Sequence, residues 1–269
     1  MAQGDFLERI IAKKRARLAE AVSARPPAGV RAEAEGRRRH SPPRAFRQAL
    51  ADGARVNVIA EFKRASPSKG EIRAGASAAE IARAYREGGA AAVSVLTEED
   101  FFRGSLRDLS EVKEAAGLPV LRKDFIFDEY QVYEAAAAGA DALLLIAAAL
   151  GDEPLARLRR LAEDELGLDA LVEVHTAGEM RRAEAAGAGL VGVNNRDLRT
   201  FNVSLETSVA LAAHAPAGAL LVSESGLRDA EDLKRLRACG YRAFLIGETL
   251  MRARRPDEAL RGLLDGGRA

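Results

Sequence analysis

Apolar and polar positions along the chain follow two different periods. Short apolar runs predict buried strands, and they alternate with stretches whose apolar residues recur every three to four positions, which predict amphipathic helices. The predicted strands are 56–62, 90–96, 119–123, 141–146, 169–174, 189–194, 219–223 and 242–246. The predicted helices between them include 77–88, 128–138, 152–166, 176–186, 204–213 and 228–238. Such alternation favours crossover connections and a parallel sheet.

A short glycine-containing phrase recurs before every second predicted strand. Its four copies are Gly88-Gly89-Ala90, Ala138-Gly139-Ala140, Ala186-Gly187-Ala188 and Ala238-Cys239-Gly240. They recur at intervals of roughly 50 residues, long enough for two strand-helix units each. The eight strands therefore predict an α/β fold, a single (β/α)8 TIM barrel over residues 51–269. A doubly wound open sheet is the alternative, although no Gly-x-Gly-x-x-Gly motif follows the first strand.

The first fifty residues predict a helical extension, residues 1–50. Residues 5–22 place apolar side chains at helical spacing with Arg and Lys between them, which predicts an amphipathic helix. Residues 25–45 are rich in Pro, Arg and Gly and predict an irregular connector. A short helix is expected over 45–50, immediately before the first strand.

The amino-acid composition limits the kinds of molecule that the protein is expected to bind. The 41 Lys+Arg and 40 Asp+Glu residues give a net charge of +1, so no overall field favours nucleic acid or an anionic membrane. The single cysteine, Cys239, excludes an internal disulfide and is expected to be structural. No run reaches the roughly 20 apolar residues of a membrane span, and residues 1–19 lack a secretory apolar core. A cytoplasmic enzyme for a small molecule fits these features.

Polar residues collect where the predicted strands end. In a TIM barrel these ends share one face, which carries the chemistry. The groups found there are Glu61, Lys63, Lys123, Glu173, Asn194 and Glu224. Any one of them could simply meet solvent. Facing inward together, they must pair with one another or with a ligand to offset desolvation, so the set favours a catalytic cluster.

Two further regions suggest a phosphate site. The loop Ser66-Pro67-Ser68-Lys69-Gly70 is small and polar, which suits a backbone that passes close to a ligand. Ser225-Gly226 and Gly247-Glu248 follow the last two strands, where many barrels bind phosphate with backbone N–H groups. The Glu248 carboxylate is expected to point away from a phosphate, because the two would repel.

Three other features carry less weight. His175 follows Glu173 at a spacing that sends both side chains to the same side, and it is expected to support the site without taking part directly. The other two histidines, His40 and His214, are too dispersed for a zinc site. Phe125 could border an apolar pocket, whereas Phe101, Phe102 and Phe127 are expected to pack in the core or on the surface.

The motifs together resemble those of the indole-3-glycerol phosphate synthase family. They are 61-EFKRASPSKG-70, 121-LRKDF-125, 173-EVH-175, 192-GVNNRDL-198 and 223-SESG-226. The resemblance runs from the N-terminal helix to the final barrel helix. It implies a carboxy-lyase of tryptophan biosynthesis that converts 1-(2-carboxyphenylamino)-1-deoxyribulose 5-phosphate to indole-3-glycerol phosphate, with loss of CO2 and water. No metal or organic cofactor is implied.

The resemblance also implies a role for each candidate residue. Lys123 would be the general acid, Glu173 the carboxylate that moves protons, and Lys63 a contact to the substrate carboxylate or phosphate. The groups that would orient substrate hydroxyls are Glu61, Asn194 and Glu224. The phosphate-side positions would be Ser66, Ser225, Gly226, Gly247 and Glu248. The remaining contacts would be Arg196 to the substrate carboxylate, Phe125 and Leu144 to the anthranilate ring, and the N-terminal extension over the barrel mouth.

Two rival interpretations remain open on the residues alone. One is another phosphate-binding barrel enzyme, either an isomerase or an aldolase whose lysine forms a Schiff base. The other is a barrel that binds a sugar phosphate without catalysis. The sequence is compatible with a monomer and leaves open any association with other tryptophan-pathway enzymes.

Overall fold

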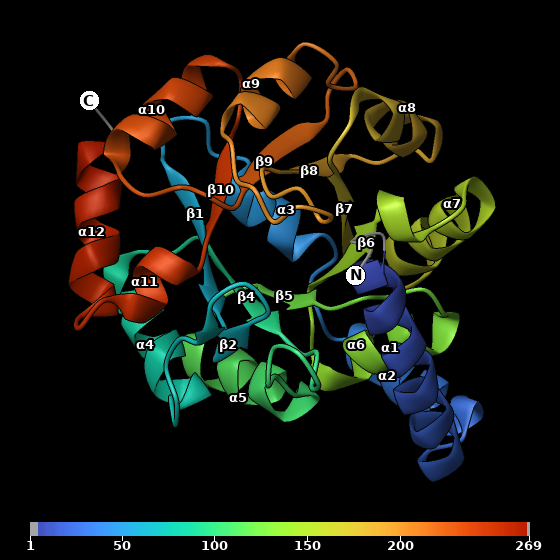
Figure 1. Cartoon of the computed structure of the whole chain (residues 1–269). Helices are drawn as coiled ribbons and strands as arrows, with labels where there is room; N and C mark the ends of the chain where they lie inside the picture. The colour runs from blue at the N-terminus through green and yellow to red at the C-terminus, as the bar shows by residue number, and fades with distance from the viewer. Residues whose placement is uncertain (1–4, 268–269) are drawn as a thin grey trace.

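A computed structural model describes residues 5–267, and its centre is a closed barrel of eight parallel strands (Figure 1). Around the barrel the order is β1, β4, β5, β6, β7, β8, β9 and β10, with β10 again beside β1. The strands are β1 Asn57–Phe62, β4 Ala92–Leu96, β5 Val120–Lys123, β6 Ala142–Ile146, β7 Asp169–Val174, β8 Leu190–Asn194, β9 Leu220–Glu224 and β10 Ala243–Ile246. This confirms the predicted TIM barrel. A two-stranded hairpin, β2 Ala65–Ser66 and β3 Gly70–Glu71, lies in the loop after β1.

Helices surround the strands in Figure 1 and pack against their outer faces. They are α4 Ala78–Gly88, α5 Leu106–Ala116, α6 Glu129–Ala138, α7 Asp152–Arg160, α8 Ala177–Ala185, α9 Glu206–Ala212, α10 Ala230–Ala238, α11 Glu248–Arg252 and α12 Pro256–Gly266. Two short segments, η1 Ala147–Ala149 and the π-helical η2 Leu161–Glu165, adjoin α7. The predicted helix 152–166 is therefore α7 followed by η2.

Side-chain caps and glycines set the limits of several helices. Asp128 caps α6 by accepting a hydrogen bond from the Tyr130 backbone N–H, and Asp229 does the same for the first turn of α10. At the other ends, Gly89 and Gly139 have positive φ angles of 93° and 95°. Glycine adopts this left-handed conformation without a Cβ clash, which explains the recurring phrase before the strands.

The N-terminal extension contains three helices: α1 Asp5–Ala24, α2 Pro27–Arg38 and α3 Ala45–Leu50. The expected irregular connector over 25–45 is wrong, because α2 occupies most of it. Pro27 lies at the first helical position, where its missing N–H is harmless. Val30 and Ala34, one turn apart, are buried in the core between the extension and the barrel helices. Packing against α6 thus outweighs a composition that disfavours a helix.

Two helices of the extension, α1 and α3, lie at opposite ends of the barrel. Phe46 and Leu50 of α3 are fully buried in the barrel interior, beside residues that begin strands, such as Leu190. The Arg47 backbone N–H donates to Asp169, the first residue of β7, over 2.8 Å. α3 therefore closes the amino end of the barrel. α1 reaches the carboxyl end, and it is the helix of the extension whose residues border the barrel mouth.

No helix of residues 5–267 is long and apolar enough to cross a membrane.

Candidate active site

Strand alternation places the functional side chains in one layer above the barrel core. Leu121, Leu171 and Val222 point into the barrel interior, where they belong to one apolar cluster. Since side chains two residues apart share a face, the residue two positions further on also points inward, near the carboxyl end of the strand. Those residues are Lys123, Glu173 and Glu224. In the same way, Glu61 lies two positions after the inward-facing Ile59 and also points into the barrel.

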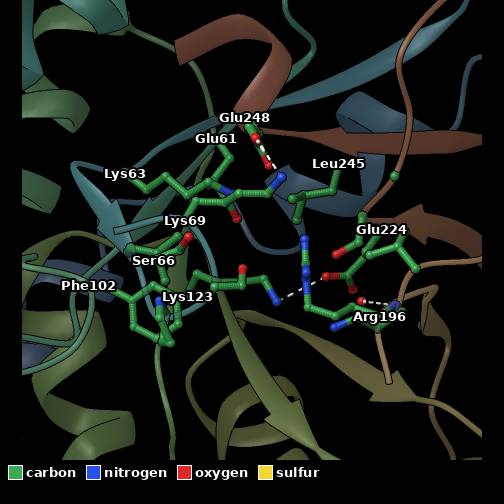
Figure 2. Close-up of a pocket in the computed structure, with 18 of the residues that line it drawn as sticks. Glu61, Lys63, Ser66, Lys69, Phe102, Lys123, Arg196, Glu224, Leu245 and Glu248 are labelled. Atoms are coloured by element: carbon green, nitrogen blue, oxygen red, sulfur yellow. Dashed lines mark hydrogen bonds and ion pairs between the residues drawn. The ribbon is translucent and has the colours of Figure 1, made fainter. Parts of the chain in front are cut away.

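A cavity of about 770 Å³ opens above this layer (Figure 2). The structure brings together every candidate site residue predicted from the sequence, and each lines the cavity: Glu61, Lys63, Ser66, Lys123, Phe125, Leu144, Glu173, Asn194, Arg196, Glu224, Ser225, Gly226, Gly247 and Glu248. They come from all parts of the barrel, so no local segment of the sequence could form the cavity alone.

Lys123 lies between two buried carboxylates. Its ammonium nitrogen is 2.7 Å from Glu173 Oε2 and 2.9 Å from Glu224 Oε2. The exposed fractions are 12% for the Lys123 side chain and 2% for each carboxylate side chain. Burial alone would lower the pKa of Lys123, but the two carboxylates raise it well above its usual range. Lys123 is therefore an ammonium ion at neutral pH.

The two carboxylates that share Lys123 differ in charge state. Burial raises the pKa of both, but Lys123 and His175 lower that of Glu173 to about 2. For Glu224, burial and repulsion from Glu173 outweigh the attraction of Lys123, and they raise its pKa to about 7. At neutral pH the site therefore contains one firmly ionised carboxylate and one that exchanges a proton readily.

The raised pKa of Glu224 predicts that its ionisation destabilises the folded protein at high pH. Between about pH 4.5 and pH 7 the folded protein binds more protons at Glu224 than the unfolded chain, so stability falls as pH rises. Glu224→Gln cannot ionise, and we expect it to be about 3 kcal/mol more stable than the parent at pH 8, with most of this gain lost by pH 5. Urea unfolding at both pH values measures this. Glu231→Gln on α10, whose parent side chain is 80% exposed, is the control. An equal gain at pH 5 and pH 8 would contradict the prediction.

A second ion pair lies at the end of β1. The ammonium nitrogen of Lys63 is 2.6 Å from Glu61 Oε1, as expected for two residues on the same side of a strand end. A Cβ at Gly247 would overlap the Glu61 carboxylate and lie 2.9 Å from the Lys63 nitrogen. Glycine at 247 therefore leaves the space that this pair occupies.

The segments that were expected to hold a phosphate border the same cavity. Ser225 and Gly226 have positive φ angles of 68° and 83°, so the chain turns sharply directly after β9. Gly247 directly precedes α11. The Glu248 carboxylate lies 3.5 Å from the Lys69 nitrogen and 3.2 Å from Arg252 Nε, and Figure 2 shows it turned toward Lys69. Two cations thus balance the charge that was expected to repel a phosphate.

Arg196 lies in the loop after β8. Its backbone N–H donates to Asn194 Oδ1 over 3.0 Å, and its Nη1 donates to the Phe201 carbonyl over 3.2 Å. Figure 2 shows Lys123, Glu224 and Arg196 converging on the cavity from different strands and loops. Two hydrogen bonds therefore hold Arg196 in the cavity wall.

Apolar side chains form another part of the wall. Phe125 and Leu144 line it as predicted, and Phe102 joins them with its ring centroid 6.4 Å from that of Phe125. The expectation that Phe102 serves packing alone is therefore wrong. Phe6 of α1 also lines the cavity, and its ring contacts Phe201 at a centroid distance of 5.1 Å.

Several lining residues received no role from the sequence. They are Phe6, Leu7 and Ile10 of α1, Lys69 of the loop after β1, and Arg228 and Arg252 near the last strands. Lys69 was detectable, because it lies within a small polar loop that follows a charged strand end. For α1 the apolar spacing indicated a packing face but not its partner, and only the family resemblance implied that the extension lies over the barrel mouth.

A TIM barrel with lysines, carboxylates and an apolar wall at the carboxyl ends of its strands defines an enzyme that acts on a small molecule. Comparison with known proteins gives the family. The model of the family described as indole-3-glycerol phosphate synthase matches residues 7–263. The chain therefore belongs to the indole-3-glycerol phosphate synthase family. Like its members, it is a decarboxylating lyase of tryptophan biosynthesis, as the resemblance implied.

Curated relatives agree with this family assignment, and a solved structure shares the fold. The indole-3-glycerol phosphate synthase of Carboxydothermus hydrogenoformans is 47% identical, covering 96% of this chain and 99% of the relative. That of Desulfotalea psychrophila is 49% identical, covering 92% and 94%. A solved thiamine phosphate pyrophosphorylase from Pyrococcus furiosus is 17% identical with a TM-score of 0.58, covering 80% of this chain and 96% of the other. This last likeness shows the fold alone.

Proposed function

We propose that Lys123 is the general acid of the ring closure that converts 1-(2-carboxyphenylamino)-1-deoxyribulose 5-phosphate to indole-3-glycerol phosphate. The observation that carries this role is the position of its ammonium group between Glu173 and Glu224, at the cavity surface. The carboxylates hold the proton in place until a more basic oxygen forms beside it. That oxygen is the one produced when the sugar ketone is attacked.

The reaction needs proton transfers at two stages. The ring carbon that bears the carboxylate attacks the ketone carbon, and the ketone oxygen takes a proton to become a hydroxyl. The C–CO2 bond then breaks and its electron pair restores the aromatic ring. Loss of that hydroxyl as water, together with a proton from the neighbouring carbon, completes the indole. One acid and one base are therefore needed close together.

Glu173 is the proposed base. Its low pKa keeps it ionised, and its contact with Lys123 lets a proton taken from the substrate return to the acid. The pair Glu61–Lys63 lies across the same cavity and supplies a second acid for the departing hydroxyl. Asn194 and Glu224 orient the sugar hydroxyls in this proposal.

The two ends of the substrate fit different parts of the wall. Phe125 and Leu144 offer an apolar surface to the aromatic ring, with Arg196 available to its carboxylate. The turn at Ser225-Gly226 and the backbone at Gly247 can offer N–H groups to the phosphate, with Ser66 and Glu248 beside them. α1 over the mouth would exclude water, which strengthens charge interactions in the transition state.

The test is direct observation of turnover. The chain contains no tryptophan, so indole emission on mixing the purified protein with the carboxyphenylamino substrate reports product without background. We expect one CO2 released per indole formed, in the presence of EDTA. If borohydride instead traps a substrate–lysine adduct, Lys123 acts as a Schiff-base nucleophile and the general-acid role is refuted.

A further inference from the structure

His175 lies beside Glu173, on the side away from Lys123. It does not belong to the cavity wall formed by the described residues, yet its side chain is only 13% exposed. Its Nε2 lies 3.4 Å from Glu173 Oε1, while the other oxygen of Glu173, Oε2, accepts from Lys123 over 2.7 Å. Glu173 therefore has one basic side chain beside each oxygen, Lys123 on the cavity side and His175 behind.

Helix α8 fixes the imidazole in this position. Nδ1 of His175 lies 3.3 Å from Glu179 Oε2, and the same oxygen accepts the backbone N–H of His175 over 2.7 Å. The Glu179 backbone N–H in turn donates to Thr176, the cap of α8. Glu179 thus holds both the ring and the backbone of His175, and Nε2 is left facing Glu173.

The charges around His175 favour its protonated form. Burial alone lowers the pKa of His175, but the hydrogen bond to Glu179 and the charges of Glu173, Glu179 and Glu224 raise it. Glu224 also pairs with Lys123, but within residues 5–267 it forms no ion pair with His175, and its pKa is raised. His175 is thus a charged partner that distinguishes Glu173 from Glu224.

We propose that His175 is a positioning residue that keeps Glu173 oriented and ionised after Lys123 has given its proton to the substrate. This rests on the proposed roles of Lys123 and Glu173. At that stage Lys123 is neutral, and Glu173 and Glu224 would otherwise face each other without a cation. With His175 protonated, Glu173 stays the base that takes the proton released during dehydration and returns it to Lys123. His175 keeps its own proton throughout.

His175→Asn tests the proposal, because Asn keeps a polar side chain and cannot carry the charge. We expect kcat to fall about 10- to 100-fold, with KM changed less than about twofold, since His175 is not among the described residues that line the cavity. Loss of a cation raises the pKa of the coupled carboxylates, so the acidic limb of the kcat profile moves up by about one pH unit. A purely structural role would lower the melting temperature without moving that limb.

Two further variants keep the test decisive. Glu179→Gln leaves His175 in place but weakens its protonation, so a smaller shift of the acidic limb in the same direction is expected; this variant carries the test if His175→Asn does not fold. His214→Asn alters an exposed histidine and should match the parent. An active parent with an unmoved acidic limb in both site variants would overturn the role of His175 alone, whereas a parent without turnover would overturn the proposed function itself.

Discussion

Lys123→Met is expected to retain the substrate and lose most of the turnover. Removal of the general acid leaves the ketone oxygen without a positioned proton donor, and we expect kcat to fall by about 1,000-fold. Glu173 and Glu224 would then be buried together without their shared cation, so one of them would take up a proton at neutral pH. Binding should change little, because the proposed phosphate and ring contacts lie elsewhere on the wall.

The measurement separates chemistry from binding. Indole emission gives kcat and KM, and titration calorimetry with indole-3-glycerol phosphate gives the affinity of the variant for product. Lys234→Met is the matched control, since Lys234 pairs with the exposed Glu231 on α10. If Lys123→Met raised KM strongly at unchanged kcat, Lys123 would be a binding group and not the acid.

The layer of functional residues could be predicted because strand geometry is local. An apolar residue that faces the barrel interior, such as Leu121 or Leu171, fixes the direction of the residue two positions later. In the sequence, the polar residues at the predicted strand ends already identified Lys123 and Glu173 without any contact information. The pairing register of neighbouring strands brings Lys123 and Glu173 together at one end of the barrel. Closure of the barrel sets that register.

The segments that could not be predicted depend on distant packing. α2 forms in a Pro- and Arg-rich stretch because Val30 and Ala34 bury against the barrel helices, which local propensity does not report. Phe102 lines the cavity because the loop after β4 folds back toward Phe125. Neither arrangement leaves a periodic signal in the sequence.

Lys14 makes such a long-range contact directly beside Lys123. Its ammonium nitrogen lies 2.8 Å from Asp124 Oδ2, and the two side chains are 5% and 0% exposed. Asp124 directly follows Lys123 and also accepts from Arg122 over 3.1 Å. α1 is therefore tied through a buried ion pair to the strand end that carries the proposed acid. Lys14 and Asp124 lie more than a hundred positions apart in the sequence. A pattern of residue spacing could therefore not have predicted that they form an ion pair.

Gly192→Ala is expected to damage catalysis through one added methyl group. Gly192 lies two residues before Asn194 in β8, so both positions face the barrel interior. A Cβ at Gly192 would overlap Glu224 Oε1 and lie 3.2 Å from Leu171 Cδ1. The carboxylate would have to move away from Lys123. Since a displacement of about 1 Å in a catalytic group can cost about 100-fold, we expect kcat/KM to fall by that amount. Overpacking should also cost about 1–3 kcal/mol of stability.

Gly189→Ala separates these two effects. Gly189 directly precedes the same strand, and a Cβ there would meet the guanidinium of Arg47, the flexible end of a side chain at the amino end of the barrel. We expect this variant to keep near-parental kcat/KM even where urea unfolding shows some loss of stability. Equal activity in both variants would mean that Glu224 can move without consequence, and its contact with Lys123 would then have no part in catalysis. A loss confined to Gly192→Ala would show that a glycine in a strand is needed because a carboxylate fills the space of its missing side chain.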